Sequence, residues 1–289
     1  MAYEIKELEK SDWPELLHEI PDPPKKLFLA GSLSRTGNKI LTVVGSRKYS
    51  PYGKEVCEFL IEGLRGYPIT IISGLALGID SIAHRTAVKH GLQTIAVPGS
   101  GLSEKVLYPK SHFSLAHEII KAGGGLISEF DNSFEATKWS FPQRNRIMAG
   151  MSHAVLVIEA EEKSGTLITS RLGTEYNRDV LTVPGSIFAS QSSGPHMLIR
   201  LGATPVTKPE DILEALNIEV EEKLQKEINT TNLNEDEQKI INVLKQGSQE
   251  KDLLIKNSGL ETSRTQIALM SLEIKGFITE VQGEIVLKN

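Results

Sequence analysis

Small residues follow nearly every short apolar run between residues 41 and 186. Small side chains let backbone N–H groups approach a ligand closely, and the amino end of a following helix favours an anion such as phosphate. A single turn of this kind can be a simple strand-to-helix connection, but several on one edge of a sheet predict a binding site. The turns are Gly45-Ser46-Arg47, Ser73-Gly74, Pro98-Gly99-Ser100-Gly101, Ser128-Glu129-Phe130, Glu159-Ala160 and Pro184-Gly185-Ser186.

Cations next to an aromatic residue indicate which phosphate ligand this site would take. Arg47 ends the first turn, the stretch KWSFPQRNR places Lys138 close to Phe141, and Lys163 precedes Ser164-Gly165-Thr166. Single-stranded nucleic acid needs positive charge for its backbone and flat faces for its unpaired bases. Two structural alternatives stay open: Phe141 can be a core residue, and the arginines of QRNR can pair with nearby acids. These arginines are Arg144 and Arg146, and the acids are Glu129, Asp131 and Glu159.

Other ligand classes lack their sequence signatures. The first turn is GSRKYSPYG rather than GxGxxG, and the second strand has no acid for a ribose, which disfavours NAD. No GxxxxGK[ST] occurs, which disfavours a P-loop nucleotidase. Asp80 and His84 stand four apart without an evident third metal ligand. We therefore predict no cofactor and no metal.

The elements that position these residues alternate in type along the chain. Apolar runs such as LTVVGSR, ITIISG and QTIAVPGSG are separated by amphipathic stretches of helical length. This pattern predicts an α/β fold, a doubly wound, Rossmann-like and mostly parallel sheet over residues 38–217. Residues 1–37 are expected to be a short lead-in, and the charged stretch 218–233 a linker. Residues 234–289 predict three helices and a hairpin turning at Gln282-Gly283, the pattern of a winged helix-turn-helix.

Composition narrows the class of protein. The 289 residues include a single cysteine, Cys57, which excludes an internal disulfide, and no apolar run long enough for a bilayer. We expect a soluble, cytoplasmic protein. The formal net charge of −5 taken alone argues against nucleic acid, but its distribution is uneven. The net charge is −1 over residues 1–40, +1 over 41–211 and −5 over 212–289.

Seven sequence elements together resemble the DNA-processing protein A family (DprA/Smf). They are VGSRKYSPYG, SGLALGIDSIAH, AVPGSGL with the following Tyr108-Pro109, SEF, FPQRNRIMAGMS, EAEEKSGTLITSRL and VPGS. The resemblance covers about Trp13 to Pro205, and residues 234–289 resemble the family's optional winged-helix tail. It implies a bacterial protein without catalytic activity that binds and protects single-stranded DNA, forms a homodimer and loads the RecA recombinase during natural transformation. Many members carry a longer helical amino-terminal domain, whereas about a dozen residues precede Trp13 here.

The resemblance and the residue pattern together define the predicted sites. The predicted DNA-binding residues are Gly45, Ser46, Arg47, Ser73, Gly74, Lys138, Phe141, Arg144, Asn145, Lys163, Gly165 and Thr166. The segment GPHMLIRLGATPV resembles the family's dimerisation segment, which implies an interface formed by Met197, Leu198, Ile199 and Leu201.

Two other functions stay open from the residues. A Rossmann-like nucleotide-phosphate hydrolase would need a catalytic acid, for which Glu129 and Glu159 are candidates. A transcription regulator would read duplex DNA with its tail, but the third tail helix offers only Arg264 and Lys275 as cations. We therefore expect the tail to contact protein.

Overall fold

A computed structural model describes residues 3–219, 233–244, 249–275, 277–281 and 284–287. The chain divides into two compact units, residues 1–220 and 221–289, each with its own core. Most of the predicted linker, residues 220–232, and the predicted turn at Gln282-Gly283 lie outside the described residues. Among the described residues, no helix combines the length and apolar character needed to cross a bilayer.

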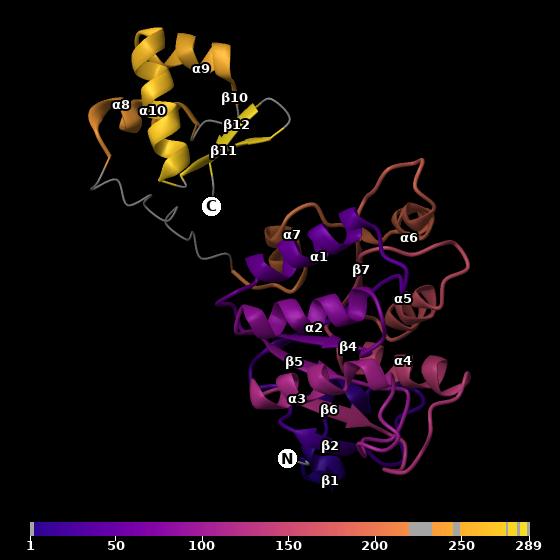
Figure 1. The fold of residues 1–289 in the computed structure, drawn as a ribbon. Coiled ribbons are helices and arrows are strands. Elements are labelled where there is room, and N and C mark those ends of the chain that lie inside the picture. The colour runs from indigo at the N-terminus through magenta and orange to yellow at the C-terminus, as the bar shows by residue number, and fades with distance from the viewer. Residues whose placement is uncertain (1–2, 220–232, 245–248, 276, 282–283, 288–289) are drawn as a thin grey trace. The chain divides into compact units, whose positions relative to one another are not determined.

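The first unit is built on a nine-stranded sheet (Figure 1). Its strand order is β1-β2-β6-β5-β4-β3-β7-β8-β9, and the seven strands from β6 to β9 in this order are parallel. This arrangement confirms the predicted mostly parallel, doubly wound sheet. The strands are β1 Ile5–Glu7, β2 Phe28–Gly31, β3 Lys39–Val44, β4 Ile69–Ser73, β5 Gln93–Ala96, β6 Gly125–Ser128, β7 Ala154–Val157, β8 Asp179–Thr182 and β9 Thr204–Pro205.

Helices cover both faces of this sheet. Alternation along β3 decides which side chain meets which layer: Val43 packs with Cys57 of α1, and Val44 packs with Met148 of α4. Figure 1 shows α1, α2 and α3 side by side. The helices are α1 Pro51–Gly63, α2 Ile79–Lys89, α3 Phe113–Lys121, α4 Ser140–Met151, α5 Thr166–Glu175, α6 Ser193–Arg200 and α7 Pro209–Ala215.

The amino-terminal residues belong to the sheet rather than to a separate lead-in. Strand β2 pairs antiparallel with β6, with Phe28 opposite Ser128, and β1 pairs antiparallel with β2. Phe28, Leu29 and Ala30 are buried, so pairing here covers the edge of β6 and extends the core. The predicted boundary at residue 38 is therefore wrong, because the sheet begins at Ile5.

The second unit has the predicted winged-helix elements. Helices α8 Glu235–Leu244, α9 Lys251–Ser258 and α10 Thr262–Ile274 pack around one apolar cluster with the strands. The sheet has three strands rather than the two of a hairpin, in the order β10-β12-β11. The additional strand is β10 Gln249–Glu250, beside β12 Glu284–Leu287 and β11 Ile278–Val281. Reciprocal hydrogen bonds between Asn234 and Glu237 form a capping box at the start of α8.

Candidate nucleic-acid interface

The predicted site lies where the sheet topology reverses direction. The chain proceeds from β3 to β4, β5 and β6 on one side and then crosses to β7 on the other side of β3. The connections after β3 and β7 therefore diverge and leave a crevice at the carboxyl edge of the sheet. A cavity of about 620 Å³ occupies this position. Its walls come from the turn after β3, the start of α4 and the loop leading into α5.

The turn after β3 exposes a cation at the mouth of this cavity. The Ser46 hydroxyl accepts from the Lys48 N–H at 3.0 Å and donates to the Lys48 carbonyl at 2.8 Å, which fixes the turn locally. The Arg47 side chain is exposed, and its guanidinium carbon lies 5.2 Å from the centroid of the Phe141 ring. This contact is a cation–π interaction, in which the Arg47 guanidinium lies over the Phe141 ring.

The start of α4 holds Phe141 in place. The Ser140 hydroxyl donates to the Gly99 carbonyl at 2.6 Å and accepts from the Thr137 N–H at 3.0 Å. A Cβ at Gly99 would lie only 2.6 Å from a Phe141 ring carbon, so only glycine leaves space for the ring here. Phe141 is half-buried and lines the cavity together with the exposed Lys138.

The loop before α5 forms the opposite wall. The Thr166 hydroxyl donates to the Gly45 carbonyl at 3.0 Å, which ties the start of α5 to the end of β3. Gly165 is exposed, and Ser164 accepts from the Thr166 N–H at 3.2 Å. Lys163 is exposed but does not line the cavity.

Arg144 departs from its predicted role. It is buried, and its guanidinium donates to the carbonyls of Gly74 and Val97, at the ends of β4 and β5. The buried Asp80 carboxylate accepts from the Gly74 N–H at 3.0 Å. Burial lowers the pKa of Arg144 to about 10, and the Asp80 charge acts in the opposite direction. We reassign Arg144 from a phosphate contact to a structural tie beneath the cavity.

Two further residues that were predicted to bind DNA, Ser73 and Gly74, lie beneath the cavity with Arg144. Ser73 is buried, and its hydroxyl donates to the Val43 carbonyl at 2.6 Å. A Cβ at Gly74 would lie 2.0 Å from an Arg144 nitrogen, so this glycine admits the guanidinium rather than a ligand. Asn145 is almost buried yet lines the cavity. The predicted residues that line the cavity are Gly45, Ser46, Arg47, Lys138, Phe141, Arg144, Asn145, Gly165 and Thr166.

Unpaired cations give the rim its positive character. Within the described ranges, Arg47, Lys48 and Lys138 form no ion pair, while Asp80 and Glu161 are the carboxylates of the lining. Lys48 also lines the cavity but was not among the predicted residues, although its position directly after Arg47 could have indicated it. Free cations of this kind can bind phosphates without first breaking a salt bridge.

The acidic residues Glu129 and Glu159, near the cavity, are already bound to other residues of the first unit. Arg146 pairs with Glu129 and lies 3.5 Å from Asp22, as the structural alternative for the QRNR arginines predicted. Burial raises the pKa of Glu129, and the Arg146 charge opposes this effect. Glu159 accepts from both the N–H and the hydroxyl of Ser50, the residue that caps α1.

Comparison with known families decides where this chain belongs. The family model for DNA recombination-mediator protein A matches residues 5–217, and the model for the DprA winged helix domain matches residues 225–284. The chain belongs to the DNA recombination-mediator protein A family. This confirms the predicted membership and extends the similarity beyond Trp13 and Pro205 at both ends.

Relatives of the family and their structures agree with this assignment. Protein Smf of Escherichia coli is 43% identical over 204 residues, which cover 71% of this chain and 54% of Smf, about half of its length. DNA processing protein DprA of Streptococcus pneumoniae is 42% identical over 201 residues, 70% of each protein. The X-ray structure of the pneumococcal protein matches with a TM-score of 0.68 at 39% identity, covering 73% of this chain and 74% of that one. A structure of DNA processing protein A from Helicobacter pylori, described for its single-stranded DNA binding mode, matches with a TM-score of 0.65 at 28% identity, covering 74% and 96%.

The predicted dimer segment of this family member is only partly exposed. Leu198 of α6 is buried in the core, so its prediction as an interface residue is corrected. Met197 and Ile199 are half-buried, whereas Leu201 is 76% exposed. Phe188, in the loop before α6, is 93% exposed and was missed because a lone aromatic residue in a loop has no periodicity to mark it.

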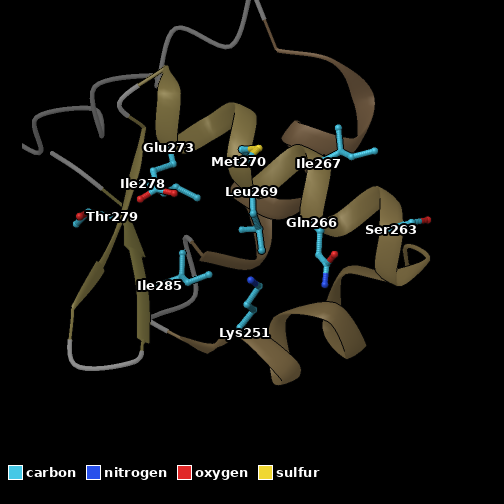
Figure 2. A pocket seen from close by; sticks show the side chains of 10 residues that line it. All are labelled: Lys251, Ser263, Gln266, Ile267, Leu269, Met270, Glu273, Ile278, Thr279 and Ile285. Atoms are coloured by element: carbon cyan, nitrogen blue, oxygen red, sulfur yellow. The ribbon is translucent and has the colours of Figure 1, made fainter.

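The winged-helix unit of this family member has a separate cavity of about 560 Å³ (Figure 2). Ile267 and Met270 of α10 line it and are largely exposed, and Ile278 of β11 lies across from the helix. Lys251 and Glu273 are the charged residues of its lining. Apolar and polar residues contribute equally to this lining, in which Lys251 is the one cation.

Proposed function

We propose that this chain is a non-catalytic, single-stranded DNA-binding recombination mediator that protects incoming single strands. The observation that carries the proposal is the Arg47–Phe141 pair at the mouth of the cavity, with unpaired Lys138 beside it. The similarity to the Helicobacter pylori protein, whose structure concerns single-stranded DNA binding, supports the proposal.

The arrangement favours single strands over duplex. A half-buried ring in a crevice can stack only on a base that is unpaired and turned toward it, while Arg47 and Lys138 are placed to hold phosphates on either side. Binding should therefore be strongly salt-dependent and tolerant of sequence.

The hydrolase alternative has less support. Its candidate acids, Glu129 and Glu159, are held by Arg146 and by the α1 cap respectively. Asp80 faces the cavity floor, but it accepts from the Gly74 N–H and lies beneath Arg144. We infer a binding site rather than a catalytic one, and we expect no turnover of nucleoside monophosphates by the purified protein.

The regulator alternative also has less support. Arg264 is paired with Asp236 at 2.7 Å, and Lys275 with Glu237 at 2.7 Å. A phosphate would have to compete with these carboxylates for both cations, Arg264 of α10 and Lys275 directly after it. We therefore propose a protein-contact role for the winged-helix unit.

RecA loading, natural transformation, homodimer formation and a cytoplasmic location come from the family resemblance. We propose them for this chain on that basis. For the homodimer, the exposed side chains of Leu201 and Phe188 near α6 add support, because large apolar side chains exposed to water favour association.

Fluorescence anisotropy with labelled single-stranded and duplex oligonucleotides tests the proposed site. Arg47→Ala and Lys138→Ala should each weaken single-strand binding for all sequences and reduce the slope of log K against log salt by about 0.7. Lys89→Ala is the matched control, since exposed Lys89 ends α2, which returns to the opposite edge of the sheet. Equal affinities for the wild type and both site variants would refute the proposal.

A further inference from the structure

The aromatic surface at the proposed site continues beyond Phe141. The ring of Tyr108 lies with its centroid 5.5 Å from that of Phe141, inclined by 53°. Tyr108 belongs to the loop between β5 and α3, and it is 46% exposed. Arg47, Phe141 and Tyr108 thus follow one another from the β3 turn toward β5.

The backbone around Tyr108 is anchored on both sides. Its N–H donates to the buried Ser100 hydroxyl at 3.1 Å, and its neighbours Leu107 and Pro109 are buried. Among the described residues, its own hydroxyl has no hydrogen-bond partner. An aromatic ring is suited to stacking when its backbone is held in place, its face is partly exposed and its hydroxyl forms no hydrogen bond.

The loop before α5, on the other side of the cavity, offers no comparable surface. The wall before α5 consists of Ser164, Gly165 and Thr166, which provide hydroxyl and backbone groups but no flat face. Trp139 is exposed, but its ring contacts Phe130 and Phe134 rather than Phe141. Stacking can therefore be extended from Phe141 toward β5, where Tyr108 lies.

We propose that Tyr108 forms a second base-stacking position for single-stranded nucleic acid, next to the one on Phe141. The bound strand then runs along the carboxyl edge of the sheet, from the β3 turn across the start of α4 to the loop after β5. This inference rests on the proposed function, because it assigns a further nucleotide to the same strand.

A ladder of oligothymidines of increasing length tests this position. Tyr108→Ala and Tyr108→Leu should bind the shortest oligonucleotides as the wild type does, and should bind longer ones about five- to thirtyfold more weakly. Tyr108→Phe keeps the flat face and should stay within about twofold of the wild type at every length. Melting curves of each variant establish that the first unit is folded.

A 2-aminopurine base placed along the oligonucleotide gives a second readout. One position should lose its stacking-induced quenching in Tyr108→Leu while a neighbouring position keeps it, and Tyr108→Phe should quench like the wild type. The inference is overturned if Tyr108→Leu matches the wild type at every length, or if Tyr108→Phe is as weak as Tyr108→Leu. Failure of the proposed function looks different, because Arg47→Ala would then match the wild type even on the shortest oligonucleotides.

Discussion

Arg144 and Arg47 were predicted for one site, but their substitution should affect different properties. Replacing Arg144 should lower stability, and replacing Arg47 should lower affinity for single strands. Arg144→Met removes a buried guanidinium and leaves the carbonyls of Gly74 and Val97 without their donor and Asp80 without its neighbouring charge. Removing one partner of a buried charged pair costs about 3–5 kcal/mol, a large share of the 5–15 kcal/mol that stabilises a typical domain. Arg47→Ala removes an exposed cation–π contact worth about 0.5–1 kcal/mol.

The chain provides a selective assay for this difference. Its only two tryptophans, Trp13 and Trp139, both lie in the first unit, so tryptophan fluorescence in urea follows the unfolding of that unit alone. Arg144→Met should shift the midpoint strongly and Arg47→Ala only slightly. Under conditions where both variants are folded, Arg47→Ala should lose single-strand affinity and Arg144→Met should retain most of it.

Two additional variants identify the cause. Both bonds come from one guanidinium nitrogen, so Arg144→Lys, which keeps the charge and has three N–H groups on one nitrogen, should recover part of the lost stability. Asp80→Asn combined with Arg144→Met should destabilise less than the two single changes added together, by about 1–3 kcal/mol. The structural role of Arg144 is refuted if Arg144→Met unfolds like the wild type, and it is replaced by a ligand role if that variant is stable but does not bind.

Three further changes test neighbouring parts of the structure. Gly99→Ala should push the Phe141 ring from its place and lower single-strand affinity severalfold in anisotropy titrations, and an unchanged affinity would contradict this packing. Leu201→Glu should convert the proposed dimer to monomer in sedimentation without loss of stability, whereas Leu198→Ala should cost about 2–5 kcal/mol in urea; the reverse pattern would restore Leu198 to the interface. Burial lowers the pKa of His84 from 6.5 to about 3, so the unfolded chain binds the extra proton and stability should fall as pH drops below about 6.5, by up to about 1.4 kcal/mol per pH unit. His84→Gln should flatten this dependence between about pH 7 and 5, and an equally steep slope in the variant would assign it to other groups.

Local sequence patterns predicted the parts of the fold that depend on local physics. The start of α1 has such a local cause in the structure, because the Ser50 hydroxyl accepts from the Gly53 N–H and Pro51 suits the first helical position. Short apolar runs followed by small residues indicated the strands and the edge where the crevice forms. The prediction that Arg47 and Phe141 serve one site agrees with their contact in the structure.

Features that depend on distant partners could not be predicted in this way. The carbonyls that hold Arg144 come from residues 70 and 47 positions earlier in the chain, so nothing in QRNR distinguishes it from an exposed arginine. Strand β2 pairs with β6 about a hundred residues later, and only that pairing makes residues 28–31 part of the sheet. Leu198 and Leu201 look equivalent in GPHMLIRLGATPV, yet the direction in which α6 packs buries the first and exposes the second.

The two units differ in how well they can bind a polyanion. The difference depends on whether their cations are already paired with acids, more than on net charge. Arg264 of α10 and Lys275 directly after it are already paired with Asp236 and Glu237, so a phosphate that binds them gains little beyond what it displaces. In the first unit Arg47 and Lys138 form no salt bridge among the described residues, and each phosphate bound there releases its own counterions. A nearly neutral unit with unpaired cations at one edge can therefore bind a nucleic acid strand that the overall charge of −5 would repel.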